Sequence, residues 1–180
     1  KVTHAWTQNP KITKILCKAS KIKHPVKNYI DMIDKIDALI IARDDMHYEI
    51  SKPFLIRKIP VFIDKPLSIN EKELNFFKKY MLQGLLMSTS GFRFSDETKM
   101  LKKKIKKMGN IKLIVANVSN DWKRYGVHML DVIDELGFLK IKKIYKINSK
   151  FSSFNLLNDK KINIIVNCFG KNYPIYNLSF

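Results

Sequence analysis

The sequence lacks the features of a membrane or secreted protein. None of its apolar runs approaches the roughly 20 residues needed to cross a bilayer. No charged head followed by a long apolar segment marks a signal peptide. The two cysteines, Cys17 and Cys168, lie far apart and form no C-x-x-C pair. We therefore expect a reduced, cytoplasmic protein without a membrane partner.

Motifs for several kinds of chemistry are also missing. No group of histidine, cysteine and carboxylate residues has the spacing of metal ligands, so we expect no metal. No P-loop, G-x-S-x-G elbow or Cys–His nucleophile pattern occurs. The six glycines are scattered singly and form no G-x-G-x-x-G. Either the fold does not bind a dinucleotide, or its first glycine-rich β-α unit is missing from this sequence.

Acidic residues are scarce. The 16 Asp and Glu residues stand against 34 Lys and Arg residues, which gives a formal charge of +18. The densest basic cluster lies within residues 102–107, in a segment where Leu101 and Ile105 have helical spacing. No base-reading motif accompanies it, so a solvated helix face explains it better than a nucleic-acid site. An acidic small molecule, such as a phosphorylated or nucleotide-linked substrate, would still suit this charge.

Strand-like and helix-like segments alternate in the first half, which predicts βαβ units and a parallel sheet. Strands are expected at residues 2–7, 37–42, 61–63 and 85–88, and helices at 11–20, 29–35, 48–57 and from Asn70 onward. The second half predicts helices at 96–108 and 122–136 and strands at 111–118, 141–147 and 162–169. The fold class is therefore α/β. A partial Rossmann-like dinucleotide-binding domain (1–90) precedes a partial α+β substrate or oligomerisation domain (91–180) with a mixed or antiparallel sheet.

One strand ends in residues that can carry chemistry. The run Val61–Ile63 is short, apolar and β-branched, and it stops abruptly at Asp64, Lys65 and Pro66. This pattern predicts a buried parallel strand whose carboxyl end presents an acid and a lysine. Ligands of open α/β sheets bind at that edge. A charged strand end is commonly just solvated. The neighbouring sequence blocks therefore decide whether this strand end binds a ligand or only faces solvent.

Four sequence blocks supply those neighbours. They are DALIIARDDMH (37–47), KIPVFIDKPL (58–67), SGFRF (90–94) and YGVHMLD (125–131). In this order and spacing the blocks resemble the Gfo/Idh/MocA family of NAD(P)-dependent oxidoreductases. The resemblance implies an enzyme that transfers a hydride between NAD or NADP and a hydroxyl or carbonyl group of a sugar, polyol or related small molecule. A homo-oligomer is one option for its assembly, and the sequence leaves the oligomeric state open.

The resemblance assigns roles to individual residues. Lys65 would hydrogen-bond the substrate oxygen and stabilise negative charge there, and His128 would take the hydroxyl proton. The substrate-binding residues would be Arg93, Tyr125 and Asp131, and Asp131 could also orient the His128 ring. Arg93 could instead pair with a nearby acid, and Tyr125 could be a core aromatic. The cofactor-binding residues would be Ala42, Arg43, His47, Asp64, Lys65 and Pro66, with His47 also capping its helix.

The sequence departs from the family pattern at three places. Asp64 stands where the family has glutamate, and Arg43-Asp44-Asp45 replaces a Thr-Pro-Asn type of loop. Arg124 stands where many members have an aspartate that assists the histidine. Because an arginine cannot act as a carboxylate, either the proton relay is altered or the chain is a non-catalytic Rossmann-type binding or scaffold protein.

Overall fold

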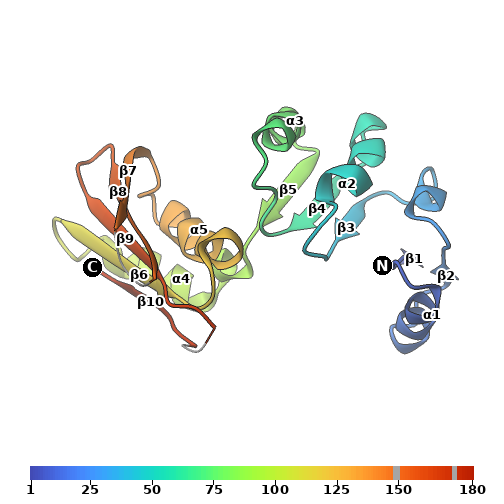
Figure 1. The fold of residues 1–180 in the computed structure, drawn as a ribbon, viewed down its shortest axis with the longest axis horizontal. Coiled ribbons are helices and arrows are strands. Elements are labelled where there is room, and N and C mark those ends of the chain that lie inside the picture. The colour runs from blue at the N-terminus through green and yellow to red at the C-terminus, as the bar shows by residue number, and fades with distance from the viewer. Residues whose placement is uncertain (148–150, 172–173) are drawn as a thin grey trace. The chain divides into compact units, whose positions relative to one another are not determined.

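The computed structural model describes residues 1–147, 151–171 and 174–180. The chain forms two compact units, Lys1–Ser88 and Thr89–Phe180. Figure 1 labels the elements of both units along the chain. Within the described ranges, no helix is both long enough and apolar enough to cross a membrane.

The first unit is built from short strands and helices that alternate. β1 (His4–Ala5) pairs in parallel with β2 (His24–Pro25). β3 (Leu39–Ile41) pairs in parallel with β4 (Val61–Asp64), and β5 (Leu86–Thr89) is the other neighbour of β4. The connections are α1 (Pro10–Ala19), the 3₁₀ turn η1 (Tyr29–Met32), α2 (His47–Ile56) and α3 (Glu71–Leu82). The Rossmann-like α/β architecture expected here is confirmed, although β1 covers only two of the six predicted residues.

Side-chain caps fix where two of these helices begin. Asn9 Oδ1 accepts a hydrogen bond from the Lys11 N–H (3.0 Å), and Pro10 occupies the first helical position of α1. Asn70 caps α3, as the sequence predicts, by accepting from the Lys72 N–H (2.9 Å). Both starts therefore follow from local sequence.

The core of the first unit packs α2 and α3 against the three-stranded sheet. Phe54 and Leu55 of α2, Ile63 of β4 and Phe77 of α3 are completely buried. Burying one such side chain contributes about 1.5–3 kcal/mol. The core therefore anchors β4 immediately before Asp64 and Lys65.

The second unit combines helices with a five-stranded mixed sheet of order β10-β6-β9-β8-β7. β6 and β9 are parallel, whereas the other neighbours are antiparallel. The sequence pattern did not indicate β8 and β10. The predicted helix at 122–136 is a π-helical turn followed by an α-helix. The elements are η2 (Gly91–Phe94), α4 (Asp96–Ile105), β6 (Leu113–Val118), η3 (Trp122–Gly126), α5 (Val127–Glu135), β7 (Ile141–Ile147), β8 (Ser152–Asn158), β9 (Asn163–Cys168) and β10 (Tyr176–Ser179).

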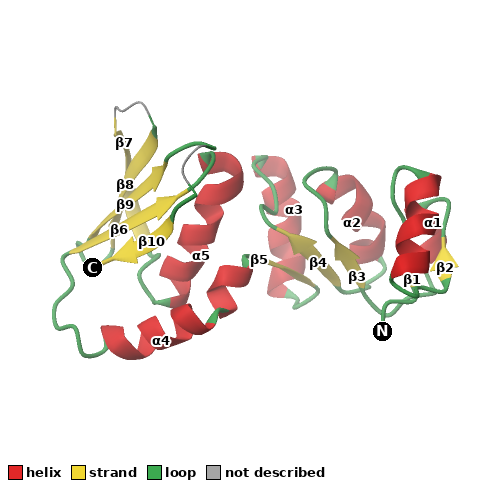
Figure 2. Cartoon of the chain, turned by 90° about the horizontal axis from the view of Figure 1, so that it is seen from below, coloured by secondary structure: helices red, strands yellow, loops and turns green. Residues whose placement is uncertain are grey.

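The core of the second unit lies between this sheet and helix α5. Ile114 and Val118 of β6, Ile133 of α5, and Ile164 and Val166 of β9 are completely buried. Figure 2 shows α5 along the sheet and α4 beside α5. This core holds α5, and therefore His128, against the sheet.

Candidate active site

Strand β4 carries Lys65 to the edge of the parallel sheet in the first unit. Asp64 ends the strand, and a cis peptide bond joins Lys65 to Pro66. The Lys65 side chain is only 17% exposed, and its Nζ lies 3.9 Å from Asp64 Oδ2. The ammonium group is therefore mostly shielded from solvent and stays beside its neighbouring carboxylate.

The loop after β3 starts at the same edge. Because β3 and β4 are parallel, with Ile41 opposite Ile63, the residues that follow them leave the sheet on the same side. The structure thus brings together Ala42–Arg43 and Asp64–Pro66, two of the segments that the resemblance assigned to the cofactor.

His47 links these two segments through their backbones. Its imidazole is buried, with Nδ1 3.0 Å from the Leu67 carbonyl oxygen and Nε2 2.5 Å from the Arg43 carbonyl oxygen. The His47 carbonyl oxygen accepts a hydrogen bond from Ser51 Oγ (2.6 Å) in α2. Since both ring nitrogens face backbone oxygens, the imidazole fixes the spacing of the two loops. We therefore interpret His47 as a residue that positions the edge.

Arg43 is held by three neighbours in the first unit. Its Nε and Nη2 atoms lie 2.7 and 2.5 Å from the Asp45 carboxylate. Its guanidinium carbon lies 5.8 Å from the centre of the Trp6 ring, and the Gln8 amide oxygen faces its Nη atoms once the amide is oriented to suit them. A cavity of about 810 Å³ is lined by Trp6, Thr7, Gln8, Arg43 and β3.

This edge of the first unit has groups that fit part of a dinucleotide. The cavity volume falls within the roughly 300–1,000 Å³ typical of ligand pockets. Arg43 supplies a cation suited to a phosphate, and Trp6 supplies an aromatic face suited to a base. The sequence has no glycine-rich turn for the pyrophosphate. These residues would therefore hold NAD(P) only in part.

In the second unit, a tight turn precedes His128. A Cβ atom at Gly126 would lie 2.7 Å from the Trp122 ring, so glycine permits the close contact that closes the π-helical turn. Asp121 Oδ1 accepts from the Arg124 N–H (3.0 Å) at the start of this turn. The Arg124 residue is exposed. The turn thus sets where α5, with His128 as its second residue, begins.

Aromatic rings and one hydroxyl surround the His128 imidazole. The ring centres of Phe92, Tyr125 and Tyr176 lie 5.1, 5.6 and 6.2 Å from that of His128. The Ser90 hydroxyl oxygen lies 2.6 Å from His128 Nδ1. Ser90 is 1% exposed, so this hydrogen bond is protected from water. Tyr125, assigned to substrate by resemblance, is thus one wall of the histidine's surroundings.

Asp131 contacts the segment that carries Ser90. Its Oδ2 atom accepts from the Ser90 N–H (2.5 Å) and from Thr89 Oγ1 (3.1 Å). The sequence spacing suggested that Asp131 could orient the His128 ring directly. The structure instead places Ser90 between them, because Ser90 bonds Asp131 through its backbone and His128 through its side chain.

Arg93 pairs with acids of α5, which is the alternative to substrate binding that the sequence left open. Its Nη1 lies 2.8 Å from Asp134 Oδ2, and its Nε lies 3.2 Å from Glu135 Oε2. The hydrogen bond that Arg93 donates to Asp134 is the main cause that raises the pKa of Arg93 above its ordinary value. Lys102, from the basic cluster, lies 2.5 Å from Glu135 Oε1 and so joins this ion-pair network.

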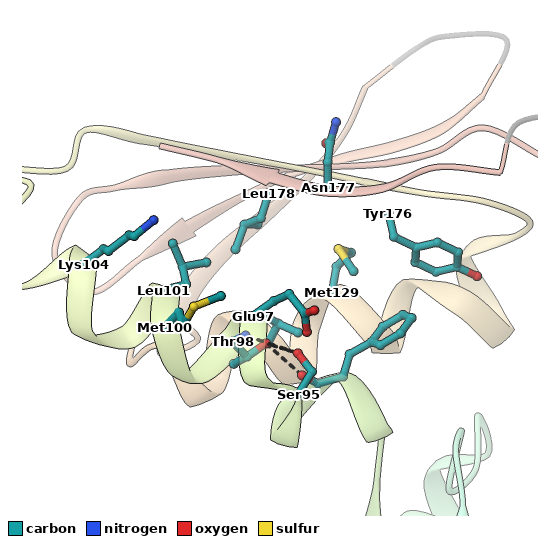
Figure 3. A pocket seen from close by; sticks show the side chains of 12 residues that line it. Ser95, Glu97, Thr98, Met100, Leu101, Lys104, Met129, Tyr176, Asn177 and Leu178 are labelled. Atoms are coloured by element: carbon teal, nitrogen blue, oxygen red, sulfur yellow. Dashed lines mark hydrogen bonds between the residues drawn. The ribbon is translucent and has the colours of Figure 1, made fainter.

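A second cavity, of about 500 Å³, lies within the second unit (Figure 3). Phe92 and Tyr176, which contact the His128 ring, also line it. Figure 3 shows Leu178 pointing toward α4 and Asn177 pointing away from it. The cavity is lined by Phe92, Ser95, Glu97, Thr98, Met100, Leu101, Lys104, Met129, Val132, Tyr176, Asn177 and Leu178. Because its lining is mainly apolar, it suits a hydrocarbon surface better than a polyol.

Three residues around His128 were not identified from the sequence. Ser90 and Phe92 lie inside the block SGFRF, which the sequence did mark. His128, however, lies 38 residues beyond Ser90. Tyr176 lies on β10, a strand that the sequence pattern did not indicate. No local feature of the sequence could have joined Tyr176 to His128.

Comparison with known proteins supports the fold and the first unit's motifs. Residues 1–81 match the Gfo/Idh/MocA profile, described as an oxidoreductase family with an NAD-binding Rossmann fold. No curated protein matches the sequence. Similar solved structures include scyllo-inositol dehydrogenase from Lactobacillus casei with bound NAD(H) and scyllo-inositol. It has a TM-score of 0.80 and 18% identity over 99% of this chain and 64% of that one.

Two further structures have the same fold. Myo-inositol 2-dehydrogenase from Lactobacillus plantarum has a TM-score of 0.82 and 18% identity, over 99% of this chain and 65% of that one. A putative NADPH-dependent oxidoreductase from Desulfitobacterium hafniense has a TM-score of 0.85 and 12% identity, over 99% of this chain and 62% of that one. This chain thus spans less than two thirds of the length of these structures. Residues 1–81 are thus similar to the NAD-binding Rossmann region of the Gfo/Idh/MocA oxidoreductases.

Proposed function

We propose that this chain is part of an NAD(P)-dependent oxidoreductase that acts on a CH–OH group of a polyol or sugar. The observation that carries the proposal is the edge of the first unit's sheet. There Lys65 stands beside the Arg43 loop, inside the region that matches an NAD-binding family. Ligands of open α/β sheets bind at the carboxyl ends of the strands.

NAD(P) would supply the hydride acceptor or donor. The chain's own residues would bind the cofactor and polarise the substrate oxygen. Arg43 would contact a cofactor phosphate through its guanidinium. Lys65 would donate a hydrogen bond to the substrate oxygen and stabilise the negative charge that develops there. The low exposure of Lys65 supports this role, because an ammonium group acts more strongly where water is excluded.

His128 is the residue that we propose for proton exchange with the substrate hydroxyl. Its support is the hydrogen-bonded and aromatic setting of the ring within the second unit. Lys65 and His128 belong to different units, and their joint action on one substrate remains a prediction from the order of the sequence blocks.

The proposed substrate class follows from two observations. Similar structures are inositol dehydrogenases, one of them with scyllo-inositol bound. The formal charge of +18 also favours an anionic substrate, such as a phosphorylated polyol. A homo-oligomer remains one option that the sequence leaves open.

An assay of inositols, other polyols and their phosphates tests the proposal. With NAD⁺ or NADP⁺ present, at least one substrate should give polyol-dependent cofactor reduction by the purified chain. Binding of NADH and NADPH, followed by the fluorescence of the reduced cofactor, should accompany it. An absence of both binding and turnover would contradict the proposal.

Arg124 favours a second candidate, a non-catalytic relative with the same fold. Its exposed side chain stands at the place where the family pattern has a carboxylate. If Arg124 alone disables the chain, the wild type should bind cofactor without turnover and Arg124→Asp should gain turnover. Turnover by the wild type would exclude this candidate.

A further inference from the structure

We propose that Ser90 is the positioning residue for His128 and holds the neutral imidazole with its proton on Nε2. The structural part of this inference stands on the second unit alone. Its catalytic consequence rests on the proposed function. Ser90 would thus orient the ring in place of the carboxylate that is replaced by Arg124.

The hydrogen bonds of the Ser90 hydroxyl determine which group donates in its contact with His128. A serine hydroxyl offers one donor and two acceptor lone pairs. The Ser90 oxygen accepts from the Phe92 N–H (3.3 Å) and lies 2.6 Å from His128 Nδ1. Among the described residues these are its hydrogen-bond partners, so Nδ1 is the acceptor that the hydroxyl proton can reach.

Burial makes this arrangement favourable. At 1% exposure, Ser90 has no access to bulk water for its proton. A buried hydroxyl that does not donate lacks the hydrogen bond that water would give it, which destabilises the folded chain. Donation to Nδ1 satisfies both groups and leaves the ring proton of the neutral form on Nε2.

Asp131 keeps Ser90 in place for this contact. Its carboxylate accepts from the Ser90 N–H (2.5 Å) and the Thr89 hydroxyl (3.1 Å). Residues 89 and 90 are thereby fixed to α5, the helix that carries His128. Asp131 acts on the ring only through this segment in the hydrogen bonds described here.

Burial and geometry argue against a nucleophilic role for Ser90. The short contact to a histidine resembles the first half of a Ser–His–Asp arrangement. The Asp131 carboxylate, however, accepts from the Ser90 backbone, and the Ser90 side chain is closed to solvent. A nucleophile must reach its substrate, so positioning explains the geometry better.

The choice of tautomer has a chemical consequence. With its proton on Nε2, the neutral ring donates a hydrogen bond from that nitrogen and cannot accept a proton there. A carboxylate beside Nδ1 would favour the opposite tautomer, with Nε2 ready to act as a base. Ser90 therefore biases His128 toward donating to a substrate oxygen.

Nitrogen NMR of the histidine rings tests this inference without cofactor or substrate. Above the pH at which the ring is charged, the His128 Nδ1 resonance should be that of an unprotonated nitrogen that accepts a hydrogen bond. A His128→Gln spectrum assigns the signal among the four histidines. In Ser90→Ala, Nδ1 should shift to the value of an acceptor without a donor, and Ser90→Thr should restore it.

Two further variants complete the test. Ser119→Ala removes another buried hydroxyl of the second unit, bonded to the Ile175 backbone, and should leave the His128 Nδ1 signal unchanged. Ser90→Asp should move the ring proton to Nδ1. A wild-type ring protonated on Nδ1, or an Nδ1 signal that Ser90→Ala leaves unchanged, would overturn the inference.

Activity separates this inference from the proposed function. In the direction of carbonyl reduction, where His128 donates to the substrate oxygen, Ser90→Ala should lower kcat about 10- to 100-fold with little change in KM, and Ser90→Thr should recover most of it. The expected ring signals without any turnover would contradict the proposed function alone. Turnover together with ring signals that do not depend on Ser90 would contradict this inference alone.

Discussion

The two units hold their candidate catalytic residues in different ways. In the first unit, Lys65 follows a buried strand, and its surroundings are backbone loops that the His47 ring links. In the second unit, His128 lies on a helix, and its ring meets the Ser90 hydroxyl and aromatic side chains.

This contrast shows two ways in which a chain can position a reactive side chain. Strand pairing fixes the backbone of β4 as far as Ile63, two residues before Lys65. A helix fixes only the backbone of His128, and the ring then needs a partner of its own to choose its rotamer and tautomer. The first kind of site depends on the core, whereas the second depends on specific hydrogen bonds.

Loss of core volume should have the largest effect on stability. Ile63 in β4 and Ile133 in α5 are each completely buried, one in each unit. Replacing either by alanine should cost about 2–5 kcal/mol of unfolding free energy, since a buried side chain is lost and a cavity remains. The chain's two tryptophans, Trp6 and Trp122, pack on the two cores separately. Each can therefore report its own unit by fluorescence.

The fluorescence readout makes this comparison specific. In a Trp122→Phe background, Ile63→Ala should shift the unfolding transition that Trp6 fluorescence reports. In a Trp6→Phe background, Ile133→Ala should shift the unfolding transition that Trp122 fluorescence reports. Ile40→Ala is the control, because Ile40 is 66% exposed on β3, and it should change stability by less than about 0.5 kcal/mol. A Trp122 transition that Ile133→Ala leaves unmoved would refute the second core as described.

Removal of the His47 ring should have an intermediate effect that is confined to the loop edge. His47→Ala leaves the Arg43 and Leu67 carbonyl oxygens without the ring nitrogens, which should cost about 1–3 kcal/mol. Amide hydrogen exchange should become faster in residues 42–46 and 65–68. His24→Ala, at an exposed position, serves as the matched control. Unchanged exchange in both segments would show that His47 does not link them.

The smallest expected effect is a pH dependence at His4. Burial, followed by the positive charges of His24 and Lys35, lowers the pKa of His4 below its ordinary value. Above about pH 6.5 both the folded and unfolded chains leave His4 neutral, and its contribution to stability is fully present. As the pH falls below that value, the unfolded chain takes up the proton first, so the first unit loses stability. His4→Asn should reduce this loss of stability, as measured by the unfolding transition of Trp6 fluorescence. A pH dependence equal to that of the wild type would rule out the contribution of His4.

Much of the first unit could be predicted from sequence because its signals are local. The apolar run that ends at Asp64 predicts β4, and Asn70 predicts the start of α3. The blocks at 37–47 and 58–67 also marked an edge at which the structure assembles Ala42, Arg43 and Lys65. Parallel pairing turns nearness in sequence into nearness in space.

The second unit could be predicted only in outline. β6 and β9 alternate between buried and more exposed residues, a pattern typical of strands. β10 has no buried residue and so lacks this pattern. The role of Ser90 depends on partners 38 and 41 residues away. Such contacts arise from tertiary packing, which residue spacing along one helix does not reveal. Asp131 illustrates this, since its place one turn after His128 suggested a direct contact.

The most direct test of the account is the turnover of Lys65→Met beside that of Lys78→Met. The second variant removes an equivalent charge from an exposed position on α3 of the same unit. If Lys65 stabilises the substrate oxygen, Lys65→Met should lower kcat about 100- to 1,000-fold with NADH or NADPH binding retained, and Lys78→Met should match the wild type. Turnover by Lys65→Met equal to that of the wild type would contradict the assignment of Lys65.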